Sequence, residues 1–365
     1  MFYHFPGQVG KLVTGEPDKK SAIEAGKTQA GADMEAGVAH VGTGAEASTA
    51  HVGAEVGARP ERSSTQPISG PSTHALFMGP GGLHPGWRIF LYLGMGVILF
   101  FILSPLEHLI PLHGAGPLWR DFYIQAVLAI SALTPAIVMA TVEKRPFGAY
   151  GLSVRSAFGK LFWIGLLWGI VSLSALMLLM RALGVFSFGE LALHGGRIAK
   201  FSIFWGAYFL LVGFFEEFTF RGYTLFTLAS GVGFWPAAIS LSLLFGGLHL
   251  FNAGEVWVGA LAAASIGMFF CFTVRRTGSL WFAVGMHASW DWGESFLYSV
   301  PDSGGMVPGH LLNPSFHGSR WLTGGSVGPE GSVLLFVVVA VLWAVFDRAY
   351  PSARNDGGGT ASPAP

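Results

Sequence analysis

The chain has 365 residues, of which 52% are hydrophobic, 14% aromatic and only 12% charged, whereas soluble domains usually contain about 25% charged residues. This composition indicates a membrane protein, and the formal net charge of zero gives no sign of a nucleic-acid partner. The single cysteine, Cys271, excludes an intramolecular disulfide and every zinc site that needs several cysteines.

Residues 1–85 differ from the rest of the chain, because they are rich in Gly, Ala, Ser and Thr and contain scattered charges. A segment with few large apolar side chains cannot offset the entropy that it loses on ordering. We therefore expect residues 1–85 to form a disordered cytosolic tail and residues 349–365 to form a second disordered tail. No apolar stretch of about 7 to 15 residues follows a basic start, which argues against a secretory signal.

From about residue 86, apolar runs alternate with short breaks that contain Pro, Gly or charged residues. A helix needs about 20 residues to cross the hydrocarbon core of a bilayer. Continuous runs such as LLFVVVAVLWAVF favour helices over barrel strands, in which apolar and polar side chains alternate. The sequence predicts an all-α polytopic membrane domain over residues 86–348 with about eight transmembrane helices. These runs lie near 87–105, 122–142, 159–183, 201–220, 234–251, 256–274, 279–299 and 331–347.

The short loops indicate an orientation. If the amino terminus is inside, the cytosolic loops and end carry eight Lys and Arg residues and the opposite loops carry five. Positive charge is enriched on the cytoplasmic side of membrane proteins. We therefore predict an integral protein of the plasma (inner) membrane with both termini in the cytoplasm. The loop 301–330 would lie outside, with Glu330 at a helix amino terminus, where an anion is favoured.

Ionisable side chains inside the apolar runs are few, and each costs at least about 2.5 kcal/mol at the centre of a bilayer. Each such residue therefore needs a partner or a functional role. These positions are Glu216, Glu217, Arg221, His249, His287, Asp291 and Glu294. We interpret Glu294, and Asn252 close to His249, as supporting or interfacial residues.

The spacing of these residues is helical. Glu217 and Arg221 are four residues apart, as are His287 and Asp291, so each pair shares one helix face. The neighbours Glu216 and Glu217 diverge by about 100° around a helix axis. We therefore assign Glu217 to an ion pair with Arg221, and we expect Glu216 to face an interior cavity, since two ionised carboxylates in one pocket repel each other.

A buried Glu, two His and an Asp on three separate helices form a set that suits hydrolysis. The carboxylate can accept a proton from water, and the imidazoles can orient that water, donate to a leaving group or stabilise an oxyanion. Two His and a carboxylate are also a known catalytic zinc ligand set. The three ligands would then be Glu216, His249 and His287, although the sequence contains no HExxH motif.

Three short motifs carry a resemblance to a known family. EEFTFR at 216–221 fits EExxxR, FGGLH at 245–249 fits FxxxH, and HASWD at 287–291 fits HxxxN/D. In this order and approximate spacing they resemble the CPBP family of intramembrane proteases, which includes CAAX prenyl endopeptidases and bacterial Abi proteins. The resemblance covers roughly residues 200–300, and we take this region as the motif core of the membrane domain.

The resemblance implies a role for each motif residue. Glu216 would activate water, His249 would help to hold that water, and Glu217 with Arg221 would support the first motif. His287 and Asp291 would form the oxyanion side. Eukaryotic members have Asn at the last motif position, and an ionised Asp accepts hydrogen bonds without donating any. Asp291 would then orient His287, be protonated or assist a metal.

The resemblance also implies an intramembrane endopeptidase, of glutamic or metal-assisted type, with its catalytic cavity inside the helical bundle. The implied partner is a membrane-associated protein or peptide, with a CAAX-like substrate as one option, that is cleaved near the cytosolic leaflet. The lipid bilayer surrounds the protein, and no nucleic acid takes part. Either no cofactor is needed or a divalent metal such as zinc takes part. Two alternatives stay open: a proton- or ion-coupled transporter, since buried acids and imidazoles can relay protons, and a non-catalytic immunity or scaffold protein on the same fold.

Overall fold

The computed structural model describes residues 78–79, 82–109, 117–252 and 254–351. The predicted tails, 1–85 and 349–365, therefore lie largely outside the described residues. All described residues belong to one compact unit. The described end of the first predicted tail contains an antiparallel hairpin of two short strands, β1 (Met78–Gly79) and β2 (Gly82–Leu83).

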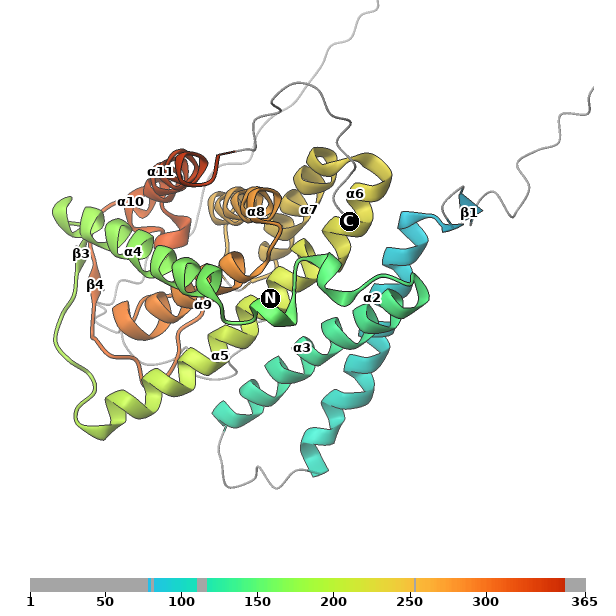
Figure 1. Cartoon of the computed structure of the whole chain (residues 1–365). Helices are drawn as coiled ribbons and strands as arrows, with labels where there is room; N and C mark the ends of the chain where they lie inside the picture. Colours follow the sequence, from blue (N-terminus) through green and yellow to red (C-terminus); the bar gives the residue numbers. More distant parts are fainter. Residues whose placement is uncertain (1–77, 80–81, 110–116, 253, 352–365) are drawn as a thin grey trace, which may run out of the picture. The chain divides into compact units, whose positions relative to one another are not determined.

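Helices make up most of the described chain (Figure 1). They are α2 (Pro85–Leu103), α3 (Pro117–Val142), α4 (Lys160–Ala182), α5 (Gly196–Arg221), α6 (Tyr223–Val232), α7 (Phe234–His249), α8 (Trp257–Thr277), α9 (Trp281–Trp292), α10 (Arg320–Thr323) and α11 (Val333–Ala349). The short 3-10 turns are η1 (Ser104–Leu109), η3 (Phe147–Tyr150), η4 (Val154–Ser156) and η6 (Pro329–Gly331), and the π-helical segment η5 (Gly293–Tyr298) continues α9. A second antiparallel pair of strands joins β3 (Phe186–Ser187) to β4 (Ser315–Phe316).

Five segments in the described part of the chain are helical, long and apolar enough to cross a membrane, so the chain is an integral membrane protein. They are Pro85–Leu109, Leu118–Val142, Lys160–Ala182, Gly196–Val232 and Trp257–Thr277. The other three predicted spans also coincide with helices, but α7, α9 and α11 are shorter, with 16, 12 and 17 residues. The count of eight crossings therefore stays a prediction.

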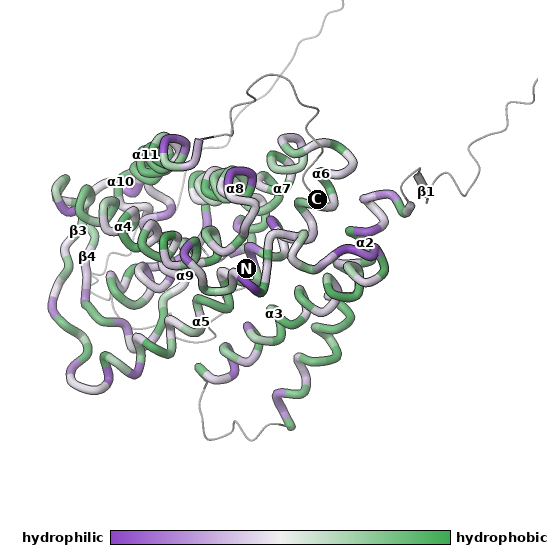
Figure 2. Tube along the Cα trace, viewed as in Figure 1, coloured by the Kyte–Doolittle hydropathy of each residue, from purple (hydrophilic) through white to green (hydrophobic). Residues whose placement is uncertain are grey.

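Hydrophobic residues predominate along these helices (Figure 2), and many of the large ones are exposed. Ile203 on α5 is 73% exposed and Phe101 on α2 is 68% exposed. Large apolar side chains on the outer face of a helix suit contact with lipid tails, which solvate hydrocarbon as well as a protein core does. The bundle therefore has large apolar side chains on its outer surface as well as in its core.

Helix α9, which carries His287 and Asp291, packs closely against α4 (Figure 1). Glycines make this approach possible, as is common between membrane helices. A Cβ atom on Gly165 of α4 would lie 2.1 Å from the carbonyl oxygen of Phe282, and one on Gly285 of α9 would lie 2.2 Å from that of Phe162. Neither glycine can gain a side chain unless the two helices separate.

We expect Gly285→Ala to lower the free energy of unfolding by about 1–3 kcal/mol, because overpacking forces backbone shifts. Gly94→Ala in α2 is the matched control, since a Cβ atom there would meet no other atom within 4 Å. The midpoint of thermal unfolding in detergent measures both variants. Equal midpoints for the two variants would contradict the close packing of α4 and α9.

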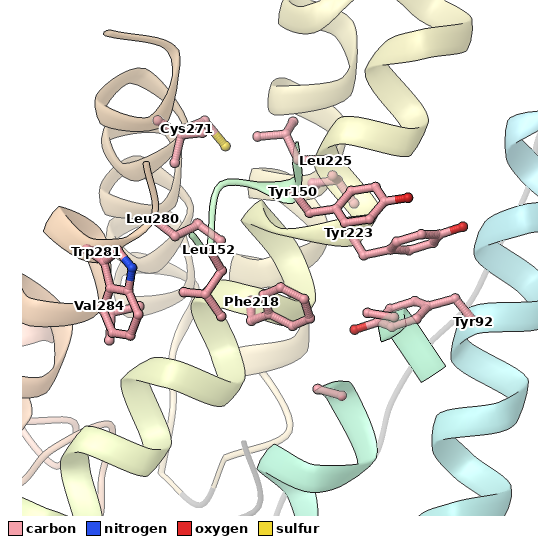
Figure 3. Close-up of a cluster of buried hydrophobic side chains, with 14 of the residues drawn as sticks. Tyr92, Tyr150, Leu152, Phe218, Tyr223, Leu225, Cys271, Leu280, Trp281 and Val284 are labelled. Atoms are coloured by element: carbon pink, nitrogen blue, oxygen red, sulfur yellow. The ribbon is translucent and has the colours of Figure 1, made fainter. Parts of the chain in front are cut away.

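A buried aromatic cluster joins α2, η3 and α6 (Figure 3). The ring of Tyr223 lies 4.6 Å from that of Tyr92 and 4.9 Å from that of Tyr150, between centroids. The hydroxyls of Tyr150 and Tyr223 both donate to the carboxylate of Glu143, which also pairs with Arg88. Burial raises the pKa of Glu143, but the hydrogen bonds from Arg88, Tyr223 and Tyr150 outweigh burial and hold this pKa below its ordinary value of 4.5.

A carboxyl group with a lowered pKa in the folded state stabilises the protein above its ordinary pKa, and this contribution is lost as the pH falls through the folded value. We therefore expect wild-type protein to lose more stability than Glu143→Gln when the pH is lowered from neutral to below 4.5. Thermal unfolding midpoints over this pH range test the difference. Parallel curves for the two proteins would show that Glu143 does not contribute to the acid sensitivity.

Candidate active site

The motif residues come together from three helices. Glu216 and Glu217 lie near the end of α5, His249 is the last residue of α7, and His287 lies in the middle of α9. Gly213, one turn before Glu216, brings α5 close to α9, since a Cβ atom there would lie 3.0 Å from the backbone nitrogen of Ala288. The two helices therefore meet at the level of the acids and the imidazole.

His287 lies at the centre of this group. Its Nδ1 is 2.8 Å from Oε1 of Glu217, so the Nδ1–H donates to this carboxylate. Its Nε2 lies 3.4 Å from Oδ2 of Asp291 and 3.8 Å from Oε2 of Glu216. Glu217 therefore orients the imidazole from one side, and Nε2 faces the other two acids.

Glu217 also pairs with Arg221, as the spacing of four residues predicts. Nη1 of Arg221 lies 3.1 Å from Oε1 of Glu217, and both side chains are fully buried. The guanidinium carbon lies 4.2 Å from the ring centroid of Phe245, a cation–π contact. Room for the guanidinium comes from Gly267 on α8, where a Cβ atom would lie 2.1 Å from Nη2. One carboxylate oxygen therefore connects the ion pair to the imidazole of His287.

His249 is oriented by its own helix. Its Nδ1 lies 2.7 Å from the carbonyl oxygen of Phe245, so Nδ1–H donates and Nε2 is left as an acceptor. The ring of Phe245 packs on the imidazole with 4.5 Å between centroids. The backbone nitrogen of Asn252 donates to the carbonyl oxygen of His249 at 2.8 Å. The Phe of the second motif thus contacts both Arg221 and His249.

A cavity of about 50 Å³ brings these groups to one space. Its walls include Glu216, His249, Asn252, His287 and Asp291. This volume has room for water, and its polar walls offer the two to four partners that an enclosed water needs. Glu216 and Asp291 are only 4% and 5% exposed. The cavity can therefore hold water beside a buried carboxylate and two imidazoles.

Four further polar residues line the same cavity, and the motif pattern does not contain them. They are Glu255, Asp302, Ser303 and Glu330. Glu255 lies between α7 and α8, and the others belong to the loop between η5 and α11. The positions of Asp302, Ser303 and Glu330 depend on how this loop folds back over the helices, so no local sequence pattern identifies them.

Glu330 lies in the first turn of the short 3-10 helix η6, directly before α11, but it does not cap α11. The side chain of Ser332 caps α11 by accepting from the backbone nitrogen of Leu334. Glu330 instead accepts from the backbone nitrogen and the hydroxyl of Ser303, at 3.1 and 2.7 Å. Because the Ser332 hydroxyl already caps the first turn of α11, the Glu330 carboxylate can bind Ser303 and line the cavity.

The predicted zinc ligands do not form a compact set in the described part of the chain. Three ligand atoms within 4.8 Å of one another occur there at Glu294, Asp302 and Glu330, and not at Glu216, His249 and His287. In both His249 and His287 the hydrogen bond to the protein is made by Nδ1. The Nε2 nitrogens of these two residues would therefore be the atoms that bind a metal. Zinc at this site stays a prediction.

Together, the apolar helices and the buried acids and imidazoles around one cavity define a polytopic membrane protein with a hydrolase-like site. Residues 198–293 match the sequence model of the Rce1-like family, described as type II CAAX prenyl endopeptidase Rce1-like. This segment contains all three motifs, and the match confirms their resemblance to the CAAX protease family. No curated protein and no solved structure matches the chain.

Proposed function

We propose that the protein is an intramembrane endopeptidase that hydrolyses a peptide bond of a membrane-associated substrate. The observation that supports this proposal best is that Glu216, His249, His287 and Asp291 line one cavity of about 50 Å³. The match to a CAAX endopeptidase family agrees with this reaction class. A cavity of this size suits a water and the scissile bond, while the rest of the substrate lies outside it.

In the proposed reaction, the carboxylate of Glu216 accepts a proton from water while the water oxygen attacks the peptide carbonyl carbon. Nε2 of His249 accepts a hydrogen bond from the other O–H of this water and orients it. The carbonyl oxygen becomes an oxyanion, to which Nε2–H of His287 donates. Because Nδ1–H of the same ring already donates to Glu217, His287 acts in this step as an imidazolium with a proton on both nitrogens. The proton on Glu216 then passes to the amide nitrogen, the C–N bond breaks, and a carboxylic acid and an amine are released.

Glu217 and Asp291 act through His287 in this scheme. Glu217 accepts from Nδ1–H at 2.8 Å and so directs the other nitrogen toward the cavity. Asp291 lies 3.4 Å from that nitrogen and orients it in the resting protein. During the reaction the oxyanion replaces Asp291 as the acceptor. Arg221 keeps the Glu217 carboxylate in place, and Asn252 borders the cavity beside His249.

The test of this proposal is a comparison of membrane peptides from cells that produce the wild-type protein or the Glu216→Gln variant. New peptide ends that appear only with the wild-type protein would identify the substrate and show whether it is CAAX-like. A transporter or a silent scaffold would yield identical peptide sets from both proteins.

The side of the membrane on which cleavage occurs depends on the orientation of the bundle. Helices α4 and α9 both run from the region of η4 toward the loop 299–332, since Leu280 donates to Gly151 at one end and β3 pairs with β4 at the other. This loop contributes to the cavity and is predicted to lie outside. The charge bias therefore places the cavity near the outer face of the membrane, whereas cleavage near the cytosolic leaflet requires the cavity near the inner face. We expect the orientation that the charge bias predicts.

Cysteine labelling distinguishes these orientations, because Cys271 is fully buried and leaves little background. Val154 and Met306 are 78% and 45% exposed at opposite ends of α4 and α9. We expect a membrane-impermeant maleimide to label Met306→Cys in intact cells and Val154→Cys only after permeabilisation. The reverse pattern would place the cavity loop in the cytoplasm and the predicted termini outside.

A further inference from the structure

A second group of acids lies next to the candidate active site. Glu294 of η5, Asp302 and Glu330 of η6 each offer a carboxylate oxygen, and these three oxygens lie within 4.8 Å of one another. All three residues follow the segment 198–293 that matches the CAAX protease family. The π-helical turns of η5 place Glu294 in this group, and such turns often occur at functional sites.

Glu294 is the residue that most needs a partner. Its side chain is fully buried, and neither carboxylate oxygen has a hydrogen bond within the described residues. The indole of Trp290 is close enough to influence the carboxyl group but completes no hydrogen bond with it. Burial of a carboxylate is costly unless a cation or several donors compensate for the lost water.

The other two carboxylates are held in place by neutral donors. Asp302 accepts from the hydroxyl of Ser295 at 3.1 Å, and Oε2 of Glu330 accepts from Ser303. Within the described ranges, no Lys, Arg or His forms a salt bridge with Glu294, Asp302 or Glu330. Hydroxyl and backbone donors that orient carboxylates toward one point are typical of the surroundings of a metal site.

We propose that Glu294, Asp302 and Glu330 bind a calcium ion beside the active-site cavity. Oxygen ligands surround Ca²⁺ at about 2.3–2.6 Å, so two ligands on opposite sides can be about 4.6–5.2 Å apart. Three carboxylate oxygens within 4.8 Å of one another can therefore bind one such ion. Mg²⁺ usually takes only one or two protein carboxylates, so a set of three favours Ca²⁺. Three carboxylates with no nitrogen or sulfur ligand also favour calcium over zinc.

The remaining ligands would be water molecules from the cavity. Asp302 and Glu330 line the same cavity of about 50 Å³ as the catalytic set, and Ca²⁺ takes six to eight oxygen ligands in all. The ion would connect the end of α9 to two points of the loop between η5 and α11. This loop forms one wall of the cavity, so calcium would stabilise the wall without taking part in proton transfer.

Terbium luminescence tests the site, because Tb³⁺ occupies calcium sites and is sensitised by nearby indole groups such as Trp290. We expect purified full-length protein to give a saturable signal that Ca²⁺ displaces. Glu294→Gln should weaken Tb³⁺ binding by about tenfold or more, and so should Glu330→Gln, since the loss of a ligand is at least as severe as the loss of its support. Glu190→Gln, at an exposed position, is the matched control and should bind as the wild type does.

Several outcomes would overturn the calcium site. These are no saturable signal with wild-type protein, equal affinity in all the variants, or loss of the signal in Glu190→Gln. Loss in Glu216→Gln with normal binding in Glu294→Gln would move the ion to the catalytic residues. If Glu294→Gln does not fold, Glu330→Gln decides the question, since an amide oxygen can still accept from Ser303. The measurement uses no peptide cleavage, so it is independent of the proposed protease activity.

Discussion

The Glu216→Gln variant should cleave peptide about 10²–10⁴-fold more slowly than the wild-type protein, since this is the usual contribution of a general base. The amide has nearly the same size as the carboxylate, but it cannot accept the proton of the attacking water. The loss should therefore appear in kcat, while KM changes little because the cavity keeps its shape. Cleavage of an identified substrate by purified protein in nanodiscs measures both constants.

The control for this experiment is Glu190→Gln, the same substitution at an exposed position between β3 and α5 that does not line the cavity. It should leave kcat and the unfolding midpoint unchanged. The Glu216→Gln protein should also insert into membranes and unfold near the wild-type temperature. Full activity of Glu216→Gln would exclude the assigned role, and a misfolded protein would require a second substitution, His249→Gln, which removes the imidazole that orients the water.

Arg221→Met should lower the free energy of unfolding by about 3–5 kcal/mol, the usual cost of removing one partner from a buried ion pair. Both side chains of the Arg221–Glu217 pair are fully buried, and Phe245 covers the guanidinium. Methionine keeps most of the apolar stem but leaves the Glu217 carboxylate without its arginine. Unfolding of the purified protein in mixed detergent micelles measures the loss.

Arg120→Met is the matched control, because Arg120 pairs with Glu107 at a similar distance of 2.9 Å but is 62% exposed. Exposed ion pairs contribute about 0–1 kcal/mol, so this control should change stability little. The double variant Arg221→Met with Glu217→Gln should regain part of the lost stability, since it removes the uncompensated charge. A small effect of Arg221→Met, equal to that of Arg120→Met, would contradict the assignment of a buried pair.

Sequence patterns within single helices predicted most of the helical segments and one ion pair of the site. Apolar runs interrupted by Pro, Gly and charge predicted segments that coincide with α2 to α5, α7 to α9 and α11. The spacing of four residues predicted the pair of Glu217 and Arg221, which lies on one face of α5. These features depend on residues within one helix, where the period of 3.6 residues sets which side chains are neighbours.

The lengths of the shorter helices were harder to predict, because the depth of a helix in the membrane depends on its neighbours. The predicted span 279–299 changes from α-helical to π-helical turns after Trp292. Helices α7, α9 and α11 are shorter than a bilayer usually requires, and their apolar composition did not reveal this.

Only the tertiary structure decided which residues from different helices meet. The contact between His287 and Glu217 joins positions 70 residues apart, and the contact between Ser303 and Glu330 closes a loop of 27 residues. Such contacts depend on close helix packing at glycines such as Gly213, and on a loop that returns to the cavity. By itself, the sequence determined the chemical groups of the site and their helix faces. Their convergence on one cavity follows from packing, because no local periodicity relates residues on separate helices.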